Sequence, residues 1–137
     1  MLTKEAILYY KDRPVEFTKD IIKATPDEIQ GDILTSVAEN QLTSVRSGHG
    51  IGKSALQSWL ILWFMCTRPF PKIPCTAPTK HQLYDILWAE VAKWMNHLIR
   101  TEIEWTKEKL YMKSNPENWF AVPRTATQPD ALQRISL

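Results

Sequence analysis

A glycine-rich run lies between a short apolar segment and a long apolar segment, and it limits the folds open to this chain. The run reads Ser47-Gly48-His49-Gly50-Ile51-Gly52-Lys53-Ser54. Small residues let backbone N–H groups approach an anion, and a following helix adds its N-terminal N–H groups and the positive end of its dipole. The run therefore predicts a phosphate-binding loop for ATP, in which Lys53 contacts the phosphates and the Ser54 hydroxyl ligates Mg²⁺.

The match to the pattern G-x-x-x-x-G-K-[ST] is incomplete, because Ser47 stands where the pattern has glycine. Serine is small and adopts turn conformations, so the loop remains a candidate. The alternative interpretation is a glycine-rich turn between a strand and a helix that binds nothing.

The segments on either side support the loop. Residues 42–45 favour a strand, and residues 55–66 are apolar on all sides, which predicts a buried helix. A membrane span needs about 20 apolar residues, and this run is bounded by Lys53 and Arg68. Prolines after Arg68 end the helix. The N-terminus does not resemble a signal peptide, so we expect a cytosolic location.

Charge and composition exclude several classes of site. The formal net charge of +2 does not by itself indicate a nucleic-acid-binding protein. Cys66 and Cys75 lack metal-ligand or redox spacing and indicate buried thiols. His49, His81 and His97 also lack metal-ligand spacing, which argues against zinc.

Hydrophobic periodicity predicts the remaining elements. We expect helices over residues 3–12, 25–37 and 79–98, a connector over 13–24 that packs through Phe17, and strands over 73–77, 102–105, 109–112 and 119–122. Capping boxes at Thr25 and Thr79 open the second and third helices. The buried faces comprise Ile29, Ile33, Leu34 and Val37 in one helix, and Leu83, Ile86, Leu87, Val91, Trp94, Met95 and Leu98 in the other. Core packing is the favoured role for Trp59, Trp63, Trp88 and Trp94. The element order predicts an α/β fold with a parallel-type sheet and helices on both faces.

Several segments of the sequence, taken together, resemble one known protein family. They are Glu28-Ile29-Gln30, the run Val45 to Ser54, Trp63-Phe64, Thr76 to Gln82 and Trp119 to Ala126. Together they resemble the large terminase subunit of tailed bacteriophages, from about Tyr9 to about Gln133. The resemblance implies an incomplete P-loop NTPase-like ATPase domain, part of a motor that uses ATP and Mg²⁺ to package viral DNA into the capsid. It also implies double-stranded DNA, a small terminase subunit, a portal and a homo-oligomeric ring as partners in the bacterial cytoplasm, with no membrane.

The resemblance assigns roles to single residues. Gln30 matches a glutamine that reads the adenine edge, which suits an amide that donates and accepts; the alternative is an exposed helix glutamine. Ala77-Pro78-Thr79 matches a motif that couples the nucleotide site to DNA, although a helix cap also explains Thr79. His49 occupies the place of the family's catalytic arginine. That leaves the source of the arginine open, with Arg46 before the loop and Arg100 and Arg124 as candidates towards a neighbouring subunit. Ordinary surface arginines explain each of them too.

Hydrolysis needs carboxylates that the chain does not show in the family's position. An apolar strand ending in Asp-Glu would hold Mg²⁺ and polarise the attacking water, and the sequence has none. We therefore expect an arm over 1–24, a partial ATPase domain over 25–133 and a tail over 134–137 outside the family pattern, with nucleotide binding but no turnover. The alternatives are a fragment of a helicase-like ATPase, and a non-catalytic module that binds an intact motor.

Overall fold

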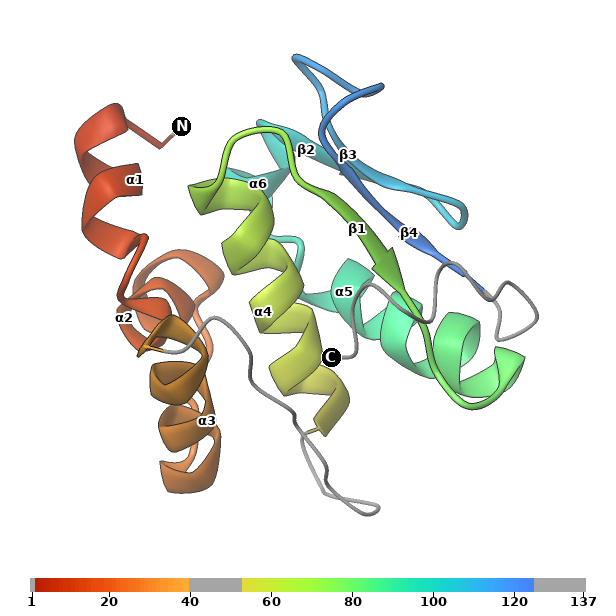
Figure 1. The fold of residues 1–137 in the computed structure, drawn as a ribbon, viewed down its shortest axis with the longest axis horizontal. Helices are drawn as coiled ribbons and strands as arrows, with labels where there is room; N and C mark the ends of the chain where they lie inside the picture. Colours follow the sequence, from red (N-terminus) through yellow and green to blue (C-terminus); the bar gives the residue numbers. More distant parts are fainter. Residues whose placement is uncertain (1, 40–52, 125–137) are drawn as a thin grey trace.

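The computed structural model describes residues 2–39 and 53–124, which combine helices with one sheet (Figure 1). The helices are α1 (Lys4–Tyr10), α2 (Pro14–Phe17), η1 (Thr18–Ile22), α3 (Glu28–Glu39), α4 (Lys53–Thr67), η2 (His81–Trp88), α5 (Ala89–Trp94) and α6 (His97–Arg100). The strands are β1 (Lys72–Cys75), β2 (Ile103–Trp105), β3 (Leu110–Met112) and β4 (Phe120–Pro123). The helices η1 and η2 are wound as π-helices, more widely than the others.

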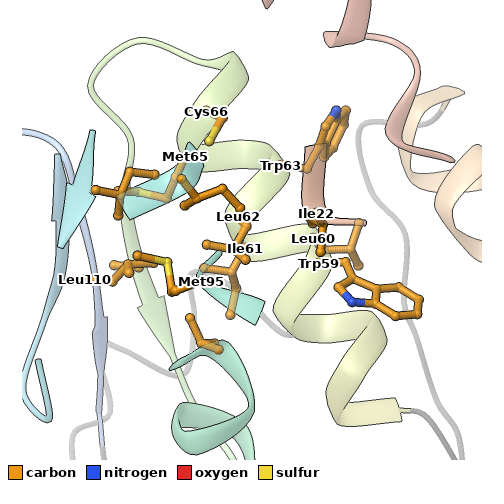
Figure 2. Packing of buried hydrophobic residues seen from close by; sticks show 14 of the residues in the cluster. Ile22, Trp59, Leu60, Ile61, Leu62, Trp63, Met65, Cys66, Met95 and Leu110 are labelled. Carbon is orange, nitrogen blue, oxygen red and sulfur yellow. The ribbon is translucent and has the colours of Figure 1, made fainter. Parts of the chain in front are cut away.

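Helix α4 is the centre of the core, and its burial confirms the buried helix predicted over residues 55–66. In Figure 2 its Leu62 and Met65 lie on the side of the sheet. Leu60 and Trp63 lie on the opposite side, towards Ile22 of η1. An all-round apolar sequence is stable here because α4 packs against other elements on both sides. The helix ends at Thr67, before the prolines that the sequence places after it.

The four described strands form an open, mixed sheet in the order β1-β4-β3-β2. β1 pairs with β4 in parallel, whereas the β4–β3 and β3–β2 pairs are antiparallel. The α/β class is confirmed, but the expected parallel-type sheet is limited to one pair. The physical reason lies in the connections, because β2, β3 and β4 follow one another through short turns, and a short turn can join only antiparallel strands.

Burial alternates along β1 and β3, whereas three consecutive residues of β4, from Ala121 to Pro123, are buried. Ile73, Ala121 and Leu110 share one row, and all three are buried towards the helices. The opposite face carries Phe120 and Tyr111, which are only half-buried. Within the described residues the helices thus cover one face, and the expectation of helices on both faces is wrong for this part of the chain.

On the face that carries Phe120 and Tyr111, which we call the open face, side chains of the strands contact one another. The Lys109 ammonium lies 4.7 Å from the ring centroid of Phe120 and 5.8 Å from that of Tyr111. Tyr111 also donates a hydrogen bond from its hydroxyl to Glu104. An antiparallel sheet with one solvated face is a common arrangement, and these contacts make it stable without a second helical layer.

Residues 13–24, predicted as a connector, form α2 and η1. Phe17 is fully buried, as expected, and Ile21 and Ile22 are buried beside it. Lys23, in the left-handed conformation with a φ of 69°, ends η1. The Asn96 side-chain amide donates to the Ile21 carbonyl over 2.7 Å. This segment is therefore part of the same hydrophobic core as α4 and the sheet.

Two helix predictions need correction at their ends. The helix expected from Thr25 begins at Glu28, and Ile29, expected inside, is 72% exposed because the first turn projects beyond the core. The helix expected over 79–98 ends at Trp94, and a new helix, α6, is capped by Asn96, which accepts a hydrogen bond from the Ile99 N–H over 3.1 Å. Ile86 is 41% exposed, since the wider winding of η2 turns it away from the buried row.

Candidate nucleotide-binding site

In Figure 1 the N-terminus of α4 points towards the same end of the molecule as the carboxyl ends of the parallel strands β1 and β4. Only residues 68–71 join α4 to β1, so the helix and the strand run in opposite directions. The N-terminus of α4 therefore faces the same way as the carboxyl ends of β1 and its parallel neighbour β4. Ligands of open α/β sheets bind outside this edge.

Lys53 and Ser54 occupy the first turn of α4, and both are half-buried. The first-turn N–H groups of a helix have no intrahelical partner, and the dipole favours an anion there. The Ser54 carbonyl accepts a hydrogen bond from the Ser58 hydroxyl over 2.7 Å, which holds the first turn to the buried part of the helix. These features suit a phosphate group.

Most of the predicted loop lies outside the described residues. This applies to Ser47, Gly48, His49, Gly50, Ile51 and Gly52, and equally to Arg46 and the strand expected over residues 42–45. Of the glycine-rich run, the structure places only Lys53 and Ser54, in the first turn of α4, and the phosphate-binding role of the run stays a prediction.

Gln30 lies in the first turn of α3, where it forms a reciprocal pair with Asp27. The Gln30 N–H donates to Asp27 Oδ1 over 2.7 Å, and the Asp27 N–H donates to Gln30 Oε1 over 2.9 Å. This is a capping box with aspartate as the N-cap residue, two positions after the predicted Thr25. Helix α3 packs on α4, and both begin at the lower end of the molecule in Figure 1. The capping role accounts for Gln30 without a nucleotide, so its contact with adenine stays a prediction.

Thr79 caps the helix that begins with η2, as the sequence indicated. Its hydroxyl accepts a hydrogen bond from the Gln82 N–H over 3.1 Å, and its carbonyl accepts one from the Leu83 N–H over 3.0 Å. The residue is exposed. Coupling of Ala77-Pro78-Thr79 to DNA remains a prediction, because capping already explains the threonine.

The arginines within the described residues have structural contacts. Arg100 donates from Nε to the Met95 carbonyl over 2.7 Å, at the C-terminal end of α5. The Arg68 guanidinium lies 4.2 Å from the ring centroid of Trp63 and donates to the Lys11 carbonyl over 3.0 Å. Partial burial lowers the pKa of Arg68. The Arg124 backbone N–H donates to the Cys75 carbonyl over 2.8 Å.

The two cysteines are buried, as their spacing indicated, and two of the three histidines lie in the described residues. Both thiols are free and buried, and burial raises the pKa of Cys66 and of Cys75 to about 12. His81 contacts Asp85 over 2.9 Å on an exposed helix surface. Across residues 2–39 and 53–124, no group of three or more histidines, cysteines or carboxylates could hold a metal ion. Within the same residues, no helix is both long and apolar enough to span a membrane.

Asp27 is the residue of this region that sequence reasoning missed. The pattern Asp-x-x-Gln just before an apolar face is itself a capping-box signal, but the overlapping Thr-x-x-Glu pattern two residues earlier competes with it.

Comparisons with known proteins found no matching family model, no matching curated protein and no matching solved structure.

Proposed function

We propose that this chain binds ATP with Mg²⁺ at the N-terminus of α4, as part of the ATPase domain of a large terminase subunit. The observation that carries the proposal is the start of α4 at Lys53, with its N-terminus facing the same way as the carboxyl ends of the parallel strands β1 and β4. The glycine-rich run leads directly into that helix.

The groups in the first turn of α4 have separate chemical tasks in this proposal. The first-turn N–H groups and the Lys53 ammonium offset the charge of the β- and γ-phosphates. The Ser54 hydroxyl is a ligand for Mg²⁺, a cation that prefers oxygen ligands and phosphate partners. The sequence pattern assigns the remaining phosphate contacts to the glycine-rich run itself.

The wider proposal follows from the resemblance of the sequence segments. The fold is then a P-loop NTPase-like domain, and the partners are double-stranded DNA, the small terminase subunit, the portal and further subunits of a ring. The place of action is the cytoplasm of a bacterial host. The mixed α/β architecture and the helix that follows the glycine-rich run are compatible with that fold.

The proposal is tested by titrating the protein with a fluorescent ATP analogue in the presence and absence of Mg²⁺. We expect Lys53→Ala to weaken binding at least tenfold, since a hydrogen bond to a charged group contributes about 1.5–3 kcal/mol. The matched control is Lys107→Ala, which removes an exposed lysine from the turn between β2 and β3. Equal binding by the wild type and Lys53→Ala would overturn the proposal, as would no binding by the wild type.

Turnover is measured separately by release of inorganic phosphate. We expect none above background, because the proposal assigns no carboxylate to polarise the attacking water. If the wild type released phosphate and Lys53→Ala did not, the expectation of no turnover would be wrong. The proposal that the chain binds ATP would still stand.

A further inference from the structure

One row of side chains crosses the open face of the sheet. Followed from β1 through β4 and β3 to β2, the register of the strands gives the row Lys72, Phe120, Tyr111 and Glu104. Residues that pair directly across strands point to the same face. Figure 2 shows Leu110, the neighbour of Tyr111 in β3, on the side of the sheet that faces α4. Because successive side chains of a strand alternate, the row lies on the opposite side, which the described helices leave uncovered.

The row places two aromatic rings side by side, where the solvated face of a sheet usually carries polar residues. Tyr111 and Phe120 are direct partners on neighbouring strands, and both are half-buried. Each ring therefore keeps surface that a ligand can reach. The Lys109 ammonium lies close to both rings, and Lys72 is exposed at the β1 end of the row.

The charges on this face favour an anion. Within the described strands, the row and Lys109 together carry two cations and one carboxylate, that of Glu104. The carboxylate lies at the β2 end of the row and accepts the hydrogen bond of the Tyr111 hydroxyl. A ligand that lies over β1, β4 and β3 therefore meets the two lysines and both rings.

Flat rings beside ammonium groups match the chemistry of a single strand of nucleic acid. Unpaired bases stack on aromatic side chains, and lysines neutralise the phosphates between them. A stacked base contributes more free energy than an exposed cation–π contact, so a base can replace the Lys109 ammonium over a ring and leave it free to reach a phosphate. Stacking and phosphate contacts need no 2′-hydroxyl, so a DNA strand suffices as the ligand.

We propose that the open face of the sheet binds single-stranded DNA, with bases stacked on Tyr111 and Phe120 and phosphates beside Lys72 and Lys109. Duplex DNA does not fit this face, because its bases are stacked on one another and cannot lie on the rings. The inference is independent of the proposed ATP site, since it uses none of the residues at the start of α4.

The test measures the fluorescence anisotropy of a labelled oligothymidylate of about 12 nucleotides, titrated with the full chain. Three competitors identify the chemistry that is recognised: a DNA duplex of the same length, an abasic strand that keeps the phosphates, and a peptide of glutamates. We expect the oligothymidylate to bind at least about tenfold more tightly than each competitor, because the competitors offer charge without accessible bases.

Variants of the aromatic residues test stacking. We expect Tyr111→Leu and Phe120→Leu each to weaken binding about tenfold, the scale of one lost stacked base. The matched control is Tyr84→Leu, which removes an exposed tyrosine of η2 and should leave the affinity unchanged.

Variants of the lysines test the phosphate contacts through the salt dependence. Lys109→Gln should reduce the slope of log K against log salt concentration by about 0.7, the value for one phosphate of a single strand. The control is Lys93→Gln, since the Lys93 ammonium also lies over a ring, 5.1 Å from the centroid of Trp94, but on α5. This control should leave the slope unchanged. If a leucine variant did not fold, the slope of Lys109→Gln would still decide the outcome.

Several results would overturn the inference. They are no binding of the oligothymidylate by the wild type, equal binding of any of the three competitors, and an affinity or salt slope that the variants of the open face leave unchanged. Loss of DNA binding in Lys53→Ala would place the strand at the ATP site instead and would also overturn it. A failure to bind ATP would contradict the proposed function alone.

Discussion

Polar side chains in this protein often bond to backbone groups of their own helix, including side chains with a predicted chemical role. Gln30 is part of a capping box, and Thr79 caps η2. The Ser58 hydroxyl donates to the Ser54 carbonyl in the first turn of the proposed phosphate site. A substitution at any of these residues therefore changes helix stability as well as ligand contacts. Variants that keep the local bond and remove the ligand contact are the informative ones.

Trp63 allows a prediction at the level of one residue. Its side chain is buried, and its indole N–H donates to the Tyr10 carbonyl over 2.8 Å, which ties α4 to α1. Trp63→Phe removes the donor and some volume, so we expect a loss of about 1–3 kcal/mol in the free energy of unfolding. Urea denaturation measures it. The neighbouring Phe64, which is 38% exposed, provides the control, and Phe64→Leu should change stability by less than about 0.5 kcal/mol. Equal effects would show that the bond to Tyr10 contributes little.

At the level of elements, the sequence predicted helices and strands best where one buried face is long and regular. The apolar run of α4 predicted a buried helix, because the charged residues at both ends make it too short for a membrane span. The start of α3 was misplaced because two capping patterns overlap, and only the position of the core decides between Thr25 and Asp27. The break after Trp94 was missed because Met95 is apolar and buried although it lies between two helices, which extends the apparent periodicity.

Asn96 at that break connects elements far apart in the sequence. Its amide donates to the Ile21 and Ile22 carbonyls over 2.7 and 3.2 Å, and its oxygen caps α6. We expect Asn96→Ala to reduce the free energy of unfolding by about 2–3 kcal/mol, from a lost cap and partly buried carbonyls left without donors. Asn96→Asp keeps the capping oxygen and should recover part of the loss. Thermal and urea denaturation of both variants, beside the exposed Asn118→Ala, provide the measurement. A loss no larger than that of Asn118→Ala would contradict this role.

At the level of the whole molecule, the sequence predicted the class of fold, but it did not predict which face of the sheet the helices cover. The alternation of strands and helices indicates an α/β protein, and the structure confirms it. Which faces of the sheet are covered depends on contacts between distant segments. Tyr111 and Phe120 pair across β3 and β4, so they share the more exposed face, where the Lys109 ammonium lies over their rings. The start of a helix at Lys53 and Ser54 was predictable from the motif, whereas the capping partner of Gln30 was not.

The two buried thiols give the whole fold a sensitivity to alkaline pH. Burial raises the pKa of Cys66 and Cys75 from 9.0 to about 12, so the folded state keeps both protons at a pH where the unfolded chain loses them. Their contribution to stability is therefore complete below pH 9 and declines as the pH rises towards 12, because the unfolded chain then releases protons that the folded state keeps. We expect urea midpoints to fall steeply between pH 9 and 10. In Cys66→Ala, the fall of the urea midpoint per pH unit should be about half as large as in the wild type, whatever the stability of the variant at pH 7. A slope unchanged by that substitution would show that other groups cause the alkaline loss.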